Sequence, residues 1–404
     1  PPYGHLPSCP LQMMSWTGAD NDVLERGDAA NFSPFCLSRR YTIPVIARRI
    51  PVFAYDWATI SLVLSINFVG LVALYSAAPS QGVFVQQIVA TILAIVGAVV
   101  IQLFSRRQIF SWAYPLYAVS IFLLAVVLVV GHEVNGSKAW LGVGALSFQP
   151  SELAKLGLVL TLARVLTLRP LERPTDYVVP TLLTLPILGL IFLEPDLGGT
   201  LVLAAGFLGM LFVRGMPTRH IIIGLVAAVI LVPTVVWPHL SGYQRDRVTI
   251  LFDLSKDPQG KGFQQIQSTI AIGSGGLFGK GYGEGTQTQL GFVPERQTDF
   301  IFSVLSEEWG FVGAVALLSL YALLFFRMGR MISECVRLED RLVIAGILSM
   351  LAFQVMVNIA VTLGLAPVTG LTLPLVSKGG SSLLMVYAGI GLVMLLHRDR
   401  YREV

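Results

Sequence analysis

About ten apolar runs, each long enough to cross a lipid bilayer, recur along this 404-residue chain. Inside hydrocarbon a segment must satisfy its own backbone N–H and C=O groups, so runs of roughly 17–25 apolar residues predict transmembrane α-helices. Composition also excludes an ordinary soluble domain, because 54% of the residues are hydrophobic and only 13% are charged. We therefore predict an all-α integral membrane protein. The expected spans are Ala58–Ser76, Phe84–Phe104, Phe110–Val130, Ser151–Leu168, Val178–Leu193, Gly199–Val213, His220–Trp237, Phe300–Phe326, Leu342–Leu365 and Ser381–Leu396.

Arginine in alternate connections predicts how these spans are oriented, since short cytoplasmic loops keep positive charge. The connections that carry it contain Arg106 and Arg107, Arg164, Arg169 and Arg173, Arg214 and Arg219, Arg327, Arg330, Arg337 and Arg341, and Arg398, Arg400 and Arg402. We expect both termini in the cytoplasm and one large extracytoplasmic loop, residues 238–299, between the seventh and eighth spans. The fifth and sixth spans are either two helices or one long helix broken around Pro195. The net charge of +4 then reflects topology, and no nucleic-acid partner is expected.

The segment 1–49 has no hydrophobic period and mixes Pro, Gly, Asp and Asn. We interpret it as disordered or as a cloning-derived extension, and residues 50–404 as the polytopic membrane domain. The three cysteines, Cys9, Cys36 and Cys335, are too scattered for a disulfide framework, and the five histidines share no ligand spacing. A protein-held metal site is therefore not expected.

The loop 238–299 is larger than a polytopic protein needs as a connector, and its glycine run at 273–281 invites a phosphate-loop interpretation. That interpretation fails, because Ser274 stands where a glycine is needed and Gly281 where Ser or Thr is needed. The glycines instead favour tight turns and close backbone approach, with a lipid-linked ligand as one candidate for what is approached. Before them, Gln265 and Gln267 alternate with Ile266, Ile270 and Ile272, which predicts a packed amphipathic segment in preference to a flexible linker.

Charged residues at membrane depth form a second group of candidates. Glu152 and Lys155 are three residues apart, which places them on one helical face where they can pair. Two roles stay open for them: a buried pair that locks the bundle, or the polar lining of a substrate cavity. The same question applies to Glu194, Asp196, Glu307 and Glu308.

Asp299 closes the loop at the start of the eighth span, and two roles fit it. Thr298 or Asp299 stands where a helix N-cap belongs, and from the residues alone capping is the commoner role. A partly shielded carboxylate near Arg296 at the membrane edge can instead act as a general base.

Several ordered motifs between about Tyr55 and the C-terminus resemble the SEDS family, most closely its elongation-specific branch. They are Trp140 with Gln149-Pro150-Ser151-Glu152 and Lys155, Glu194-Pro195-Asp196-Leu197-Gly198, Tyr243-Gln244-Arg245-Asp246-Arg247, Gln267-Ser268 with 272–276, Pro294-Glu295-Arg296-Gln297-Thr298-Asp299-Phe300, and Pro367-Val368-Thr369-Gly370 with Gly379-Gly380-Ser381-Ser382. Two positions differ from the residue common in the family, Lys138 in place of Arg and Glu194 in place of Gln. Lys378 lies where the family varies, and none of the three breaks the pattern.

The resemblance implies a peptidoglycan glycosyltransferase in the bacterial cytoplasmic membrane that polymerises lipid II on its outer face. Asp299 would deprotonate the sugar 4-hydroxyl, and undecaprenyl diphosphate would leave with inversion. Developing charge on that diphosphate calls for cations, with a divalent ion such as Mg²⁺ or Mn²⁺ as the alternative and no other cofactor expected. The candidate substrate-binding residues are Trp140, Glu152, Lys155, Arg245, Arg247, Lys280, Arg296, Ser377 and Lys378. Without the resemblance, each basic residue is more commonly a surface charge or a lipid-headgroup anchor. Trp140 is then more commonly an aromatic residue at the membrane interface.

The resemblance also implies a partner, a class B penicillin-binding protein that carries out transpeptidation, besides lipid II, the nascent glycan strand and membrane lipids. Two other functions stay open: a lipid II flippase or transporter, and a non-catalytic scaffold for a transpeptidase. No inverted repeat is apparent, and the candidate residues gather externally, both of which disfavour a transporter.

Overall fold

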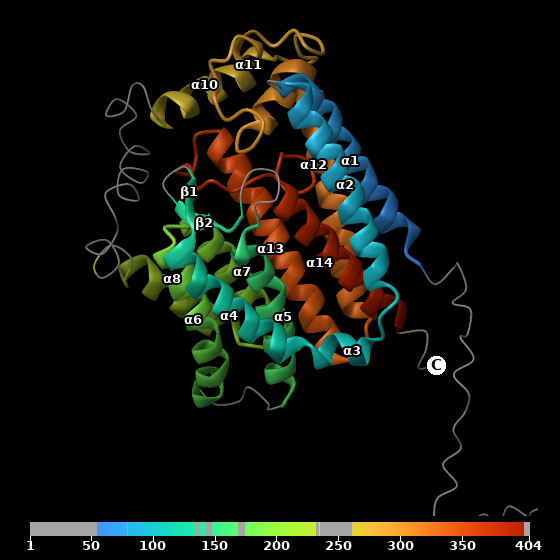
Figure 1. Cartoon of the computed structure of the whole chain (residues 1–404), viewed down its shortest axis with the longest axis vertical. Helices are drawn as coiled ribbons and strands as arrows, with labels where there is room; N and C mark the ends of the chain where they lie inside the picture. The colour runs from blue at the N-terminus through green and yellow to red at the C-terminus, as the bar shows by residue number, and fades with distance from the viewer. Residues whose placement is uncertain are drawn as a thin grey trace, which may run out of the picture. The chain divides into compact units, whose positions relative to one another are not determined.

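The computed structural model describes residues 55–78, 80–134, 137–142, 148–168, 174–231, 234 and 261–399. Segment 1–49, with Cys9 and Cys36, and the candidates Arg245 and Arg247 lie outside these residues. The described chain is built from helices (Figure 1). They are α1 (Trp57–Ala77), α2 (Gln81–Ile101), α3 (Arg106–Ser111), α4 (Ala113–Val130), α5 (Pro150–Leu168), α6 (Val178–Leu193), α7 (Leu197–Arg214), α8 (Thr218–Leu231), α10 (Lys261–Ser274), α11 (Thr286–Gln289), α12 (Ile301–Glu334), α13 (Leu338–Thr362) and α14 (Gly380–Asp399), with a 3₁₀ turn at Pro174–Tyr177 before α6.

Among the described residues, eight helical segments are long and apolar enough to cross a membrane. They coincide with eight of the ten expected spans and confirm the all-α membrane fold. The other two expected spans correspond to α5 and α8. Helix α5 carries three charged side chains, Glu152, Lys155 and Arg164, and the described part of α8 is only 14 residues long. The total of ten spans stays a prediction.

The turn Glu194–Asp196 separates α6 from α7, so the fifth and sixth expected spans are two helices. Asp196 caps α7 by accepting a hydrogen bond from the N–H of Gly199 at 2.8 Å. A two-stranded hairpin between α4 and α5, β1 (His132–Val134) and β2 (Ser137–Trp140), was not expected. Strands of three and four residues are too short to give a periodic signal.

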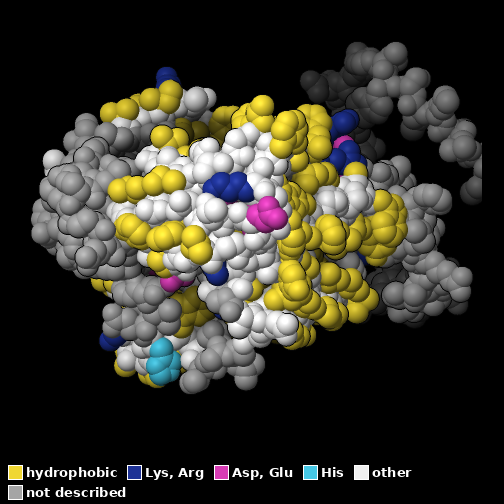
Figure 2. All heavy atoms as spheres, turned by 90° about the horizontal axis from the view of Figure 1, so that it is seen from above, with side chains coloured by type: hydrophobic (Ala, Val, Ile, Leu, Met, Phe, Trp, Pro, Cys, Tyr) yellow, Lys and Arg dark blue, Asp and Glu magenta, His cyan; other side chains and the backbone are white. Residues whose placement is uncertain are grey.

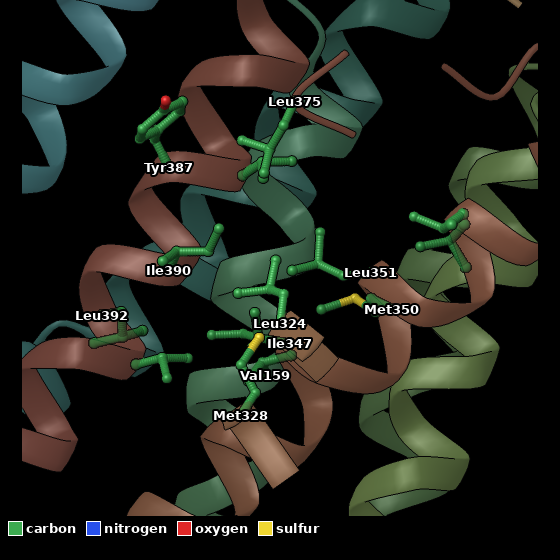
Figure 3. Close-up of a cluster of buried hydrophobic side chains, with 14 of the residues drawn as sticks. Val159, Leu324, Met328, Ile347, Met350, Leu351, Leu375, Tyr387, Ile390 and Leu392 are labelled. Carbon is green, nitrogen blue, oxygen red and sulfur yellow. The ribbon is translucent and has the colours of Figure 1, made fainter. Parts of the chain in front are cut away.

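Helices α13 and α14 lie at the centre of the bundle. In each of them 61% of the residues in an apolar 18-residue stretch are buried, whereas the corresponding share in α2 is 17%. Helix α13 packs on α5 and α7, α14 on α2, and α1 on α12. Figure 3 shows side chains from four elements meeting in the core, among them Val159 of α5, Leu324 of α12, Ile347 of α13 and Ile390 of α14.

Small residues bring α7 and α13 unusually close. A Cβ at Gly209 would lie 1.9 Å from the Oγ of Ser349, and one at Gly206 would lie 2.6 Å from the Cγ of Met350. Close packing of this kind associates helices in lipid, where burial of apolar surface gives little driving force.

The arginine-bearing ends of several helices meet on the side of the bundle opposite α10 and α11 (Figure 1). Arg106, the first residue of α3, forms ion pairs with Glu339 and Asp340 at the start of α13. Arg398 of α14 donates to the carbonyl of Gln102 at 3.0 Å. Alternate connections therefore do share a side, as the arginine pattern predicted.

Helix α12 is interrupted at Gly310, whose φ of 66° and ψ of −162° are not helical. Its first part, Ile301 to Trp309, lies on the side of α10 and α11, and the remainder runs through the bundle (Figure 1). Asp299 immediately precedes this first part.

Candidate active site

Asp299 is half-buried at the entry to α12. The helix begins at Ile301, and its capping position is Phe300, which makes no side-chain capping bond. The hydroxyl of Thr298 donates instead to the carbonyl of Glu295 at 3.3 Å. The helix thus begins one to two residues later than either expected cap would place it, and the capping role of Thr298 or Asp299 stays a prediction.

The connection 371–379, between α13 and α14, lies directly against the Asp299 segment. The backbone N–H of Lys378 donates to the carbonyl of Gln297 at 2.9 Å, and the hydroxyl of Ser377 donates to the carbonyl of Thr298 at 2.6 Å. Ser377 is buried and also accepts a bond from the N–H of Leu373 at 2.8 Å. The structure thus brings the candidates Ser377 and Lys378 beside Asp299, and it gives the Ser377 hydroxyl a structural task.

The glycine run after α10 is inserted into the break in α12. The N–H groups of Lys280 and Gly281 donate to the carbonyls of Glu307 and Glu308 at 3.0 and 3.1 Å. In return, the N–H of Phe311 donates to the carbonyl of Gly276 at 2.9 Å. The loop thereby satisfies backbone groups that the break at Gly310 releases from the helix.

Glycine is required where this loop touches α12. A Cβ at Gly279 would lie 2.0 Å from the carbonyl oxygen of Glu308, and its φ of +82° is a conformation that side chains disfavour. The predicted tight turns are confirmed, and the linker alternative is wrong. The close backbone approach that the structure shows is to α12, and approach to a lipid-linked ligand stays a prediction. The amphipathic segment predicted before the glycines is confirmed as α10.

Glu307 is the buried acceptor that holds this loop together. Its carboxylate accepts bonds from the backbone N–H groups of Gln287 and Thr288 at 2.9 and 3.0 Å. It also accepts one from the Lys280 ammonium at 2.7 Å. Lys280 donates further to Ser274 and Thr286, both at 2.7 Å. The structure therefore gives Lys280 partners within the loop, whereas its contact with substrate stays a prediction.

Arg296 joins the loop to the end of α1. Its guanidinium donates to the carbonyl of Ala77 at 2.9 Å and to the carbonyl of Thr288. Glu308, next to the break, accepts bonds from Ser76 of α1 and from Gln289 of α11. These contacts place the Asp299 segment, α11 and the end of α1 in one hydrogen-bonded unit.

Glu152 and Lys155 form the ion pair that their spacing predicted, with 2.8 Å between carboxylate and ammonium, and both side chains are buried. Trp140 is half-buried at the end of β2, which lies against α4 and α5. In the turn before α7, burial and then the charge of Asp196 raise the pKa of Glu194 to about 8. A protonated Glu194 presents both a hydrogen-bond donor and an acceptor.

Within the described residues, no group of three or more His, Cys, Asp or Glu side chains could hold a metal ion by itself. A divalent cation held jointly by phosphate and a carboxylate stays a prediction. Figure 2 views the molecule from the side of α10 and α11, where hydrophobic side chains cover much of the face and a few charged ones gather near its middle. Exposed hydrophobic residues of this loop include Leu277, Phe278 and Leu290.

Two further side chains at the site were missed by sequence reasoning, Gln87 and Asn358. The amide of Gln87 contacts the carbonyl of Ser377 and the N–H of Gly379, both at 3.2 Å, and the amide of Asn358 contacts the carbonyl of Asp299 at 2.9 Å. A single buried polar residue in the middle of an apolar span was the available signal.

Comparison with known proteins gives consistent matches. The FtsW/RodA/SpoVE family model, described as "Cell cycle protein", matches residues 48–402. The chain is 41% identical over 292 residues to the peptidoglycan glycosyltransferase MrdB of Escherichia coli, which is 72% of this chain and 79% of MrdB.

Two solved structures are also similar to this chain. One belongs to a study described as "Structural coordination of polymerization and crosslinking by a peptidoglycan synthase complex", with a TM-score of 0.77 and 53% identity, covering 86% of this chain and 99% of that one. The other is the rod shape determining protein RodA of Thermus thermophilus, with a TM-score of 0.68 and 47% identity, covering 87% and 99%.

Proposed function

Because the chain belongs to the SEDS family of FtsW, RodA and SpoVE proteins, we propose that it is a peptidoglycan glycosyltransferase of cell elongation that polymerises lipid II. Asp299 is its general base in this proposal. The observation that carries the assignment is the placement of Asp299: the half-buried carboxylate stands at the entry to α12, beside a backbone held by the loop and by the connection 371–379. The identity of the substrate is inferred from the family, and the position of Asp299 supports its assignment as the base.

The proposed reaction is one inverting displacement. Asp299 accepts the proton of the sugar 4-hydroxyl of one lipid II, and that oxygen forms a bond to the anomeric carbon of the growing chain. The bond from the anomeric carbon to the diphosphate breaks, and undecaprenyl diphosphate leaves with the electron pair.

Negative charge develops on the leaving diphosphate, so a cation nearby lowers the barrier. Among the described candidates, Lys280 and Arg296 donate through their side chains to protein groups. The bond that the structure gives Lys378 comes from its backbone N–H, which places the backbone of this half-buried residue beside the Asp299 segment. We assign the diphosphate contact to Lys378, with Mg²⁺ or Mn²⁺ as the alternative source of positive charge.

The protein is a bacterial integral membrane protein. We assign it to the cytoplasmic membrane with both termini in the cytoplasm and the loop 238–299 outside. The clustering of arginine-bearing helix ends opposite α10 and α11 supports that orientation.

A class B penicillin-binding protein is the proposed partner, together with lipid II, the glycan strand and membrane lipids. The similar chain from a "peptidoglycan synthase complex" supports this pairing of polymerisation with crosslinking. The exposed hydrophobic side chains Leu277, Phe278 and Leu290 on the outer loop suit contact with a membrane-anchored protein.

An Asp299→Ala variant separates the proposed enzyme from the transporter and the scaffold. The variant should bind lipid II as the wild type does and form no polymer, and the control Glu284→Ala, an exposed carboxylate of the same loop, should polymerise normally. Polymer formed equally by Asp299→Ala and wild type would reject Asp299 as the base. Binding of lipid II with no polymer from the wild type would favour the transporter or the scaffold.

A further inference from the structure

The connection 371–379 has no helical hydrogen-bond ladder, yet side chains from four helices hold its backbone. Asn67 of α1 donates to the carbonyl of Leu375 at 2.9 Å, and Tyr321 of α12 donates to that of Pro374. Gln354 of α13 donates to the carbonyl of Thr372 at 2.9 Å. With Gln87 of α2 at Ser377, these contacts make the connection a rigid frame.

Asn358 differs from the other amides because it reaches beyond this frame. Its Nδ2 donates to the carbonyl of Leu371 at 2.7 Å and to the carbonyl of Asp299 at 2.9 Å. Both amide hydrogens are thus used, and the residue is 1% exposed. Asn358 therefore couples the frame to the backbone of the proposed base.

The two peptide planes on either side of the Asp299 Cα are fixed by different partners. In the plane before it, the carbonyl of Thr298 accepts from the Ser377 hydroxyl at 2.6 Å. In the plane after it, the carbonyl of Asp299 accepts from Asn358, and the N–H of Phe300 donates to the carbonyl of Glu295 at 3.3 Å. Because peptide groups are planar, fixing both planes fixes φ and ψ of Asp299 and therefore the direction of its Cα–Cβ bond.

We propose that Asn358 is a positioning residue for the glycosyl transfer: its amide fixes the Asp299 peptide plane and so aims the carboxylate at the hydroxyl it deprotonates. The inference rests on the function proposed above. A displacement of about 1 Å at a reacting group costs on the order of 100-fold in rate, so a side chain that never touches substrate can control turnover.

The test compares Asn358→Leu with a matched control, Gln354→Met. Gln354 lies one turn earlier on α13, is also buried, and donates to the same frame, but not to Asp299. Both changes remove a buried amide of similar size, so both should lower the thermal unfolding temperature. Only Asn358→Leu should lower kcat for lipid II polymerisation, by about 100-fold, with KM unchanged.

A proportional loss of kcat in both variants, or a raised KM with unchanged kcat in Asn358→Leu, would overturn the proposal. If Asn358→Leu does not fold, Ser377→Ala releases the other peptide plane and should show the same fall in kcat at constant KM; normal kcat in that variant would overturn it too. Wild type and Asp299→Asn are assayed alongside. Equal polymer from those two would reject the proposed base itself, which is a different result from normal kcat in Asn358→Leu with an inactive Asp299→Asn.

Discussion

Replacing Glu307 with Ala should release the outer loop from α12. The carboxylate accepts the backbone N–H groups of Gln287 and Thr288, and both would lose a buried acceptor. Each unsatisfied buried group costs about 1–3 kcal/mol, whereas the Lys280 side chain is 25% exposed and can hydrate instead. We expect the docked loop to lose about 3 kcal/mol, which raises the population of its open form roughly 150-fold.

Hydrogen exchange measured by mass spectrometry on peptides covering 280–291 reports this opening directly. The amides of Lys280 and Gly281, which donate to α12, should exchange faster in Glu307→Ala by about that factor. Polymerisation should fall as well, because the carbonyl of Thr288 anchors Arg296, three residues before Asp299. The control Glu284→Ala removes an exposed carboxylate of the same loop and should leave both properties unchanged. Unchanged exchange in a folded Glu307→Ala protein would refute the reasoning.

Three further predictions concern stability in detergent. Lys155→Met leaves the buried Glu152 carboxylate without its ammonium partner and should lower the free energy of unfolding by about 3–5 kcal/mol. Adding Glu152→Gln should restore most of this stability. Equal unfolding temperatures for Lys155→Met and wild type would contradict the prediction. Burial, and then the charge of Asp196, raises the pKa of Glu194 from 4.5 to about 8. The unfolding temperature should therefore fall as the pH rises from about 4.5 to about 8 and then level off, and Glu194→Gln should remove this fall. Gly279→Ala places a methyl group 2.0 Å from a carbonyl oxygen and should abolish correct docking of the loop, seen as rapid proteolysis there; a protease-resistant loop would argue against the close contact.

Features that depend on short sequence separations were predictable. Glu152 and Lys155 are three residues apart on one helix, so their spacing already contained their geometry. The apolar period of 264–272 likewise predicted the amphipathic helix α10. The glycines after it predicted the turns, and Gly276, Gly279 and Gly281 all have positive φ.

Features that depend on distant segments were not predictable from one sequence. Asn358 and Asp299 are 59 positions apart, and nothing local in either segment specifies their contact. Nothing local shows that Glu307 serves as an acceptor for α11 rather than as part of a substrate cavity, because the same carboxylate in an apolar span fits both roles. The break at Gly310 is also hidden, since a lone glycine in a helical pattern is usually tolerated without a kink.

The most direct test of the central claim is polymerisation of purified lipid II by this protein with the proposed transpeptidase partner, comparing wild type and Asp299→Asn in the same detergent. The amide keeps the shape of the side chain and cannot accept the hydroxyl proton. The account predicts polymer from wild type and none from Asp299→Asn at equal lipid II binding. Equal polymer from the two proteins would contradict it and place the base elsewhere.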